Sequence, residues 1–304
     1  MKLLLTFLAS IVIAGSSRAA FFTNSASADS FVRSNAPTSN YGGAGALSVS
    51  GFNSVNGSGV TNGVFDSFIR FNTAAMVTNF NSLFGSNNWV IGGVKLRVTE
   101  LGTPANTLFN RGKGAFEIRW IANDNWIEGT NPPTAPTTNG IAYNDEPALL
   151  NGATDASLGT FTNAGADGTL SFPLALPAAF TGDLKAGGDV GIFLTAIDPG
   201  IGFTFDSRSF GTTNARPFLE ISGMPQPGIV AISLSGANVT LSATNGAADG
   251  TYYVLTGTNL AQPLNQWQPV TTNMLTVGGN FSITATNAAN ASALGQQFFI
   301  LQTQ

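Results

Sequence analysis

Short runs in which apolar and polar residues alternate recur along the chain, and loops rich in Gly, Asn, Thr and Pro separate them. The alternation is clearest in 65–71 (Phe-Asp-Ser-Phe-Ile-Arg-Phe) and in 94–98 (Val-Lys-Leu-Arg-Val). A period of two puts the apolar side chains on one face of an extended strand, so these runs predict half-buried antiparallel strands. Because the runs are short and the links between them turn-rich, as in 34–45 and 129–144, we expect an all-β fold, a jelly-roll β-sandwich.

The composition supports strands over long helices. Only 9% of the 304 residues are charged, against about 25% in an ordinary soluble domain, and exposed helices rely on Lys and Glu. Two segments, 73–84 and 177–185, are the only helix candidates. The strand candidates before residue 222 are 64–71, 90–98, 115–121, 169–174, 190–197, 202–206 and 217–221.

Residues 1–19 have the pattern of a secretory signal peptide. Lys2 gives a positive start, an apolar stretch follows, and Ser17-Arg18-Ala19 is a small-x-small cleavage site. The apolar stretch is too short for a transmembrane helix, which needs about 20 residues. We therefore expect a secreted protein, extracellular or on the cell surface, that does not span a membrane. Cleavage leaves ten basic and 16 acidic residues, and this negative balance argues against nucleic acid as a partner.

The mature chain is expected to hold two domains. Residues 20–222 form the jelly-roll domain, and 223–228 (Gly-Met-Pro-Gln-Pro-Gly) form a linker. Residues 229–304 form a smaller immunoglobulin- or fibronectin-like β-sandwich, with Trp267 and the Tyr252-Tyr253 pair available for its core. Its strand candidates are 229–234, 238–243, 251–256, 267–271, 280–285 and 297–301. This second domain is either a spacer or docking unit, or it has a ligand site of its own.

Two residue types are missing, and their absence excludes whole classes of chemistry. The chain has no Cys and no His, so disulfides, thiolate nucleophiles, Ser–His–Asp catalysis and Cys- or His-bound metals cannot occur. Carboxylate pairs, acid–base work by Lys, Arg or Tyr, oxygen-ligated calcium and no catalysis at all remain open. We expect no cofactor. A structural calcium ion is possible, but the loop acids Asp124, Asp145, Glu146 and Asp155 lack EF-hand spacing, so its ligands stay open.

An ordered series of short motifs between residues 28 and 221 carries a family resemblance. The pieces are Ala28-Asp29-Ser30-Phe31-Val32-Arg33-Ser34-Asn35-Ala36-Pro37, Asn40-Tyr41-Gly42, Leu47-Ser48-Val49, Ser67-Phe68-Ile69-Arg70-Phe71, Gly93-Val94-Lys95-Leu96-Arg97-Val98, Asn125-Trp126-Ile127-Glu128-Gly129, Tyr143-Asn144-Asp145-Glu146-Pro147, Phe205-Asp206-Ser207-Arg208-Ser209 and Ala215-Arg216-Pro217-Phe218-Leu219-Glu220-Ile221. The series resembles the DNRLRE domain, which is related to carbohydrate-binding module family 96. The resemblance implies a jelly-roll domain of secreted bacterial proteins with acidic polysaccharide, such as alginate, as the ligand class.

An acidic polysaccharide needs fixed cations, and Arg suits this role because its planar fork meets a carboxylate with two hydrogen bonds. Lys95 and Arg97 share one face of a predicted strand, and Arg119 lies in another, so these three are candidate ligand-binding residues. Trp126 and Tyr143 flank the longest loop, where exposed rings can stack on sugar faces. The alternative for Trp126 is that it pins this loop together with Glu128 and Gly129.

A second group of motif residues has a structural interpretation. It consists of Asp29, Arg33, Arg70, Glu128, Arg208 and Arg216, in which the arginines pair with acids such as Asp29, Glu128 or Glu220 and tie strands and loops together. We expect Arg208 in particular to be substantially buried and paired with a carboxylate or with backbone carbonyls.

Three functions fit these patterns. The first is a non-catalytic carbohydrate-binding protein for an anionic polysaccharide. The second is an enzyme: a lyase could use Tyr143 with a cation, and a glycosidase could use two of the acids Glu117, Glu128, Asp145 and Glu146, but no spacing singles out a pair. The third is a cell-surface or matrix protein whose β-domains only assemble or adhere.

Overall fold

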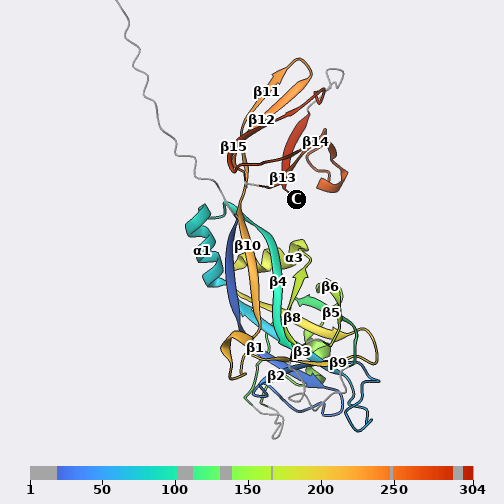
Figure 1. Ribbon diagram of the computed structural model, residues 1–304. Helices are drawn as coiled ribbons and strands as arrows, with labels where there is room; N and C mark the ends of the chain where they lie inside the picture. The colour runs from blue at the N-terminus through green and yellow to red at the C-terminus, as the bar shows by residue number, and fades with distance from the viewer. Residues whose placement is uncertain are drawn as a thin grey trace, which may run out of the picture. The chain divides into compact units, whose positions relative to one another are not determined.

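The computed structural model describes residues 19–100, 112–130, 139–165, 167–246, 249–289 and 297–303. Over these residues the chain is an all-β protein (Figure 1). It divides into two compact units between Gly223 and Met224, and the short segment Phe84–Val90 groups with the second unit. The predicted signal peptide lies outside the described residues apart from residue 19. No helix among the described residues is long and apolar enough to cross a membrane.

The larger unit is a jelly-roll-like β-sandwich built from one ten-stranded sheet that folds back on itself. Its strands run in the order β1-β10-β4-β9-β2-β3-β8-β5-β6, and β7 pairs with β4. Strand β1 also pairs with β3, so it joins both layers of the sandwich. The strands are β1 (Ala20–Arg33), β2 (Ala46–Ser50), β3 (Phe65–Asn72), β4 (Trp89–Glu100), β5 (Gly114–Ile121), β6 (Ala156–Asn163), β7 (Gly168–Leu174), β8 (Asp189–Ala196), β9 (Gly202–Asp206) and β10 (Phe218–Pro225).

Phenylalanine fills the space between the layers. Phe116 of β5 is fully buried and meets Phe161, Phe172 and Phe203, with ring centroids 5.0–6.1 Å apart. Helix α1 (Ala74–Phe84) buries Met76 and Phe80, which lie one turn apart on one face. Helix α3 (Ala178–Ala186) likewise buries two residues. Both helices agree with the two predicted helical segments to within one residue at each end.

Strand β3 corrects the expectation of a half-buried strand. Its first five residues are all buried, including the polar Asp66 and Ser67. The cause is a second apolar cluster on the other face of β3, where Phe68 packs with residues of the long loop segments that follow β5, such as Trp126 and Ile141. These loops therefore cover the sheet, and β3 is sandwiched between two apolar layers.

The structure also has elements that the alternation pattern does not predict. Strand β1 is small and polar through most of its middle (residues 23–30), β2 has only five residues, and β6 contains Gly159, so the strand preference of each is weak and pairing with neighbours sets its position. The short helices η1 (Tyr143–Asp145) and α2 (Glu146–Leu149) lie within the loop that follows β5. The predicted linker 223–228 is too long: β10 continues to Pro225 and the next strand begins at Gly228, because both ends extend the pairing of their sheets.

The smaller unit consists of two three-stranded antiparallel sheets, β11-β12-β15 and β14-β13-β16. Its strands are β11 (Gly228–Ser235), β12 (Asn238–Gly246), β13 (Thr251–Gly257), β14 (Gln268–Met274), β15 (Gly279–Ala285) and β16 (Phe298–Thr303). The apolar core between the sheets includes Val239, Leu241, Tyr252 and Val254. Trp267 is also buried, as predicted, whereas Tyr253 is half-buried.

We expect Phe116→Ala to lower the free energy of unfolding of the larger unit by about 3–5 kcal/mol, because it removes a buried ring from a close-packed cluster. Denaturant or calorimetric unfolding measures the change. Phe21→Ala is the matched control, because the Phe21 side chain is 69% exposed. Equal losses from both substitutions would show that the cluster around Phe116 does not carry the core.

Candidate functional site

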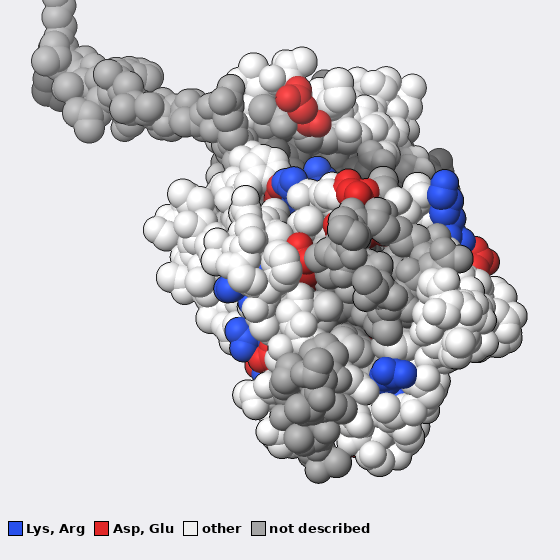
Figure 2. Space-filling view, turned by 60° about the horizontal axis from the view of Figure 1, so that its bottom comes forward, with Lys and Arg blue, Asp and Glu red and all other residues white. Residues whose placement is uncertain are grey.

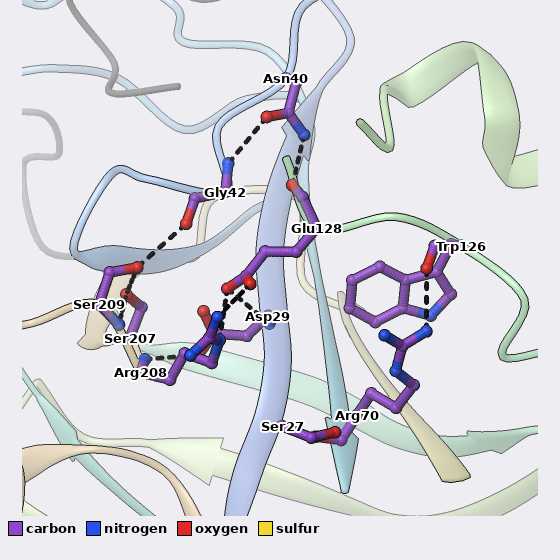
Figure 3. A network of polar contacts seen from close by, with 10 residues as sticks. All are labelled: Ser27, Asp29, Asn40, Gly42, Arg70, Trp126, Glu128, Ser207, Arg208 and Ser209. Atoms are coloured by element: carbon purple, nitrogen blue, oxygen red, sulfur yellow. Dashed lines mark hydrogen bonds and ion pairs between the residues drawn. The ribbon is translucent and has the colours of Figure 1, made fainter. Parts of the chain in front are cut away.

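An ion pair between Glu128 and Arg208 stands at the centre of a polar network on the loop side of the larger unit (Figure 3). Arg208 Nε donates to Glu128 Oε1 at 2.7 Å, and Arg208 Nη2 donates to Oε2 at 2.6 Å. This is the two-bonded geometry in which Arg and a carboxylate interact most strongly. Arg208 thus pairs with a carboxylate as predicted, but its side chain is 40% exposed, because the 207–209 turn lies at the surface.

Asp29 of β1 lies fully buried beside this ion pair. Its Oδ2 accepts a hydrogen bond from the Arg208 backbone N–H at 2.6 Å, and its own N–H donates to Glu128 Oε1 at 3.1 Å. Burial raises the pKa of Asp29 to about 7, although the Arg208 N–H opposes this shift. Strand β1, the loop after β5 and the turn after β9 are therefore held at one point.

Asn40 extends the network to the far side of the loop. Its Nδ2 donates to the carbonyl oxygens of Glu128 at 2.7 Å and Ile141 at 3.0 Å, and its Oδ1 accepts from the Gly42 N–H. The chains approach so closely that a Cβ on Gly42 would overlap the Glu128 carbonyl. Gly129 has a φ of +76° and its space is likewise occupied by Asn40. Only glycine fits at these two positions.

Arg70 of β3 holds the same loop from beneath. Its Nη1 donates to the carbonyl oxygens of Asp124 at 3.1 Å and Trp126 at 2.9 Å, and its Nε lies 3.4 Å from Asp189 Oδ2. The guanidinium group lies over the Trp126 ring, 5.0 Å from the centroid, which is a cation–π contact. Trp126 itself is 6% exposed and packs against Phe68. Its indole is therefore an inner wall rather than the exposed stacking surface that we expected.

A pair of carboxyl groups anchors the second half of the loop. Asp66 of β3 and Glu146 of α2 lie close enough to interact electrostatically. Burial, together with the neighbouring Asp66, raises the pKa of Glu146 to about 9, and burial raises that of Asp66 to about 6. Burial and the same two acids raise the pKa of Tyr143 above its usual value.

A cleft of about 660 Å³ opens between the two halves of this loop. Polar groups of Asn125, Asn139 and Asp145 line it together with apolar surface of Trp126, Ile127, Ile141 and Leu149. Ile127 is 72% exposed. Its size and mixed lining are those of a small-ligand site, and among the described lining residues none is Lys or Arg.

The three candidate cations lie elsewhere and are not brought together. Lys95 and Arg97 of β4 both contact Glu220 of β10, at 3.7 and 3.5 Å, and Arg97 also lies over the Phe218 ring. Arg119 of β5 contacts Glu117 at 3.8 Å. Strands β9, β2, β3 and β8 stand between β4 and β5 in the sheet order. Figure 2 shows few charged atoms on the loop side, scattered and with opposite charges beside several of them. Within the described residues, Lys95, Arg97 and Arg119 therefore do not form one continuous cationic binding surface.

The remaining predicted structural arginines have local partners. Arg33 Nε donates to Asn35 Oδ1, and its guanidinium lies over the Phe65 ring. Arg216 Nε donates to the Phe210 carbonyl oxygen at 2.9 Å. Neither joins the Glu128–Arg208 network through a hydrogen bond that the structure shows.

The four loop acids considered for calcium do not gather into one site. Asp155 accepts backbone N–H groups of Ala122 and Asn151, and Asp145 accepts that of Ala142, so both acids stabilise turns. Within the described residues, no group of three or more acids is arranged to hold a metal ion.

Sequence reasoning missed Asn40 and Asp66 as site residues. Asn40 belongs to the Asn-Tyr-Gly motif. An Asn close to a Gly is a signal for a side chain that hydrogen-bonds to nearby backbone groups, as Asn40 does. Asp66 occupies a polar position in the alternating run 65–71, so the pattern predicts that it is exposed. Its neighbour Glu146 lies 80 residues later in the sequence, and no local pattern relates the two.

No protein-family model matches the chain, and no curated protein matches its sequence. Among solved structures, it is similar to β-glucuronidases. That of Ruminococcus gnavus with uronic isofagomine is 9% identical, with a TM-score of 0.22, over 79% of this chain and 32% of that one. That of Lactobacillus rhamnosus is 12% identical, with a TM-score of 0.24, over 95% and 42%. The chain spans less than half the length of these enzymes, and similarity at this level carries no information on its activity.

We expect Arg208→Ala to lower the free energy of unfolding by about 1–3 kcal/mol, because it removes both guanidinium donors to Glu128, whose side chain is only 13% exposed, while the backbone N–H that donates to Asp29 remains. Arg208→Lys should lose less unfolding free energy than Arg208→Ala but remain less stable than the native chain, since an ammonium group cannot make two parallel hydrogen bonds to the carboxylate. Chemical denaturation measures both. Arg97→Ala is the matched control: its pair with Glu220 is longer, so the loss should stay below about 1 kcal/mol. If Arg208→Ala and Arg97→Ala lower the free energy of unfolding equally, the Glu128–Arg208 ion pair does not stabilise the larger unit more than an ordinary surface pair.

The raised pKa of Asp29 predicts a dependence of stability on pH. Between the unfolded pKa of about 3.9 and the folded pKa of about 7, the folded state keeps a proton that the unfolded state releases. Stability should therefore fall as the pH rises through this window. In Asp29→Asn the decline should be shallower, whereas Asp249→Asn, an exposed position, should leave it unchanged. Unfolding measured from pH 4 to 8 tests this, and identical slopes in Asp29→Asn and the native chain would contradict it.

Proposed function

We propose that the chain is a secreted, non-catalytic carbohydrate-binding protein whose larger unit holds a glycan in the cleft beside Trp126. The cleft carries this proposal, because it places amide and carboxylate groups next to exposed apolar surface. Sugars need both: hydroxyl groups hydrogen-bond to the former and the C–H faces of the ring pack on the latter. Export rests on the signal-peptide pattern of residues 1–19.

The surroundings of the cleft favour binding over hydrolysis. A glycosidase needs two carboxyl groups on either side of the scissile bond, roughly 5–10 Å apart. Among the described lining residues the acid is Asp145, whose Oδ2 accepts the Ala142 N–H. Glu128 is engaged by Arg208, and Glu146 by Asp66. Each neighbouring acid therefore already has a structural partner.

The lyase alternative has a similar difficulty. A Tyr base must lose its proton near neutral pH, and a cation must neutralise the sugar carboxylate beside it. Burial, together with the nearby Glu146 and Asp66, instead raises the pKa of Tyr143 and disfavours the phenolate. We therefore place Tyr143 among the residues that support the cleft.

The cleft and the exposed face of strand β4, which carries Lys95 and Arg97, suit ligands of different charge. The described lining of the cleft carries one acid and suits an uncharged glycan. The acidic polysaccharide implied by the family resemblance would bind on β4 instead, where Lys95 and Arg97 are 53% and 37% exposed. It would have to displace Glu220 from both cations, so this binding would be sensitive to salt.

Affinity measurements distinguish the two modes. We expect the full chain to bind a neutral β-glucan with little change between low salt and about 0.5 M salt, since apolar contacts and hydrogen bonds between uncharged groups are not screened. Ile127→Ala should weaken this binding at least about 5-fold. Ile197→Ala is the matched control, because Ile197 is 50% exposed and lies outside the cleft.

Three other results would each reject one part of the proposal. Binding of alginate or pectate that disappears at high salt and in Arg97→Ala, with Ile127→Ala unaffected, would reject the cleft in favour of the strand face. Failure to bind any of the three glycans would reject carbohydrate binding and leave the assembly or adhesion role. Ultraviolet-absorbing products from alginate or pectate would reject a non-catalytic function.

A further inference from the structure

The smaller unit has an apolar groove between two sheet edges. Strand β11 is the edge of one sheet and β16 the edge of the other, and no described strand pairs with their second sides. A groove of about 350 Å³ lies between them, lined by Ile232 and Leu234 of β11, Phe298 and Ile300 of β16, and the nearby Leu260 and Trp267. Because one groove touches both strands, the two open edges lie on the same side of the sandwich.

Side chains that belong to the core face are exposed in this groove. The register of β11 and β12 places Ile232 opposite Leu241 and Leu234 opposite Val239. Leu241 and Val239 are buried, yet Ile232 and Leu234 are 53% and 68% exposed. An apolar stripe that points toward a core and remains in water is typical of an interaction surface.

The edge of β11 lacks the features that keep edge strands apart. Natural sheets protect such edges with charged residues, Pro or bulges. Residues 228–235 (Gly-Ile-Val-Ala-Ile-Ser-Leu-Ser) contain no charge and no Pro, and their bulge lies at the beginning, between Ile229 and Ala231. The unpaired backbone N–H and C=O groups along the edge of β11 can be satisfied by another β-strand. Because the groove lining is uncharged and apolar, an uncharged strand with apolar side chains fits it best.

We propose that the partner is a second copy of this chain, joined through antiparallel pairing of β11 with β11. Strand β11 is itself a partner of this kind, since it is uncharged, apolar at positions 232 and 234 and, among the described strands, unpaired along one edge. A two-fold axis perpendicular to the sheets pairs the β11 strands and brings the two β16 edges together as well, because both edges face the same side. Both sheets then continue across the dimer, and each copy covers the apolar groove of the other.

Sedimentation of the full chain from Ala20 tests the proposal. We expect a dimer, and we expect Ile232→Lys or Leu234→Lys to raise its dissociation constant at least about 100-fold, because a charge would enter the shared groove. Both positions are more than half exposed, so the monomer tolerates Lys, which circular dichroism verifies. Val277→Lys is the matched control: Val277 is 70% exposed and lies outside the groove, and this variant should remain a dimer.

Cross-linking gives a second readout that does not depend on affinity. The chain has no Cys, so a single introduced thiol can form a disulfide only between copies. Facing residues of an antiparallel pair lie within disulfide range. Because the residue on the two-fold axis faces its own copy, we expect one of the single Cys substitutions along residues 230–235 to yield a covalent dimer on oxidation, and Ser242→Cys in the inner strand β12 to yield none. A monomer at all concentrations, lysine variants that still dimerise, or slow amide exchange of β11 in a monomer would overturn the proposal.

Discussion

The loop side of the larger unit depends on one buried acid and the ion pair above it. Asp29, Glu128 and Arg208 come from segments 80 to 179 residues apart in the sequence, and three hydrogen-bonded contacts join them. Long irregular loops lose much conformational entropy on ordering, which a few exposed contacts cannot offset. Here the Arg208 guanidinium binds the Glu128 carboxylate, and the Asn40 amide and the Arg70 guanidinium bind backbone carbonyl oxygens of the same loop. The cleft walls are thereby set before a ligand arrives, so the ligand does not bear that ordering cost.

The same network brings titration near neutral pH to a chain without His. An exposed Asp or Glu titrates near pH 4, but burial raises the pKa of Asp29 to about 7 and that of Glu146 to about 9. Both groups lie on segments that support the cleft. Loss of either proton places a negative charge in a buried site, beside Glu128 for Asp29 and beside Asp66 for Glu146. Alkaline conditions therefore weaken the supports of the cleft, while the lining itself changes little.

Much of the fold was accessible from the sequence, because alternation and turn residues act locally. Strands β4, β5 and β8 were predicted to within two residues at either end, and the two longer helices likewise. Strands β1, β2 and β6 were missed because they are short or contain small residues such as Ser, Ala and Gly, which have little preference for the extended state. The burial of both faces of β3 could not be predicted, since its cover comes from Trp126 and Ile141, far away in the sequence. The pairing of Arg208 with Glu128 rather than with Glu220 depends on the same tertiary arrangement, as does the separation of Arg97 from Arg119.

The scarcity of charge connects the two proposals. Arg70, Arg97, Arg119 and Arg208 are each engaged with an acid of the same chain, so the cleft is left to amides and apolar surface. The edge of β11 is left without the charges that would keep copies apart. A dimer joined through β11 carries two clefts, and a polysaccharide offers many identical sites along one chain. Two weak clefts that engage one polymer gain affinity by about 10²–10⁴-fold when the polymer spans both, without any additional contact. Weak binding in a single cleft and assembly through an unprotected strand edge are therefore compatible parts of one mechanism for retention on a glycan surface.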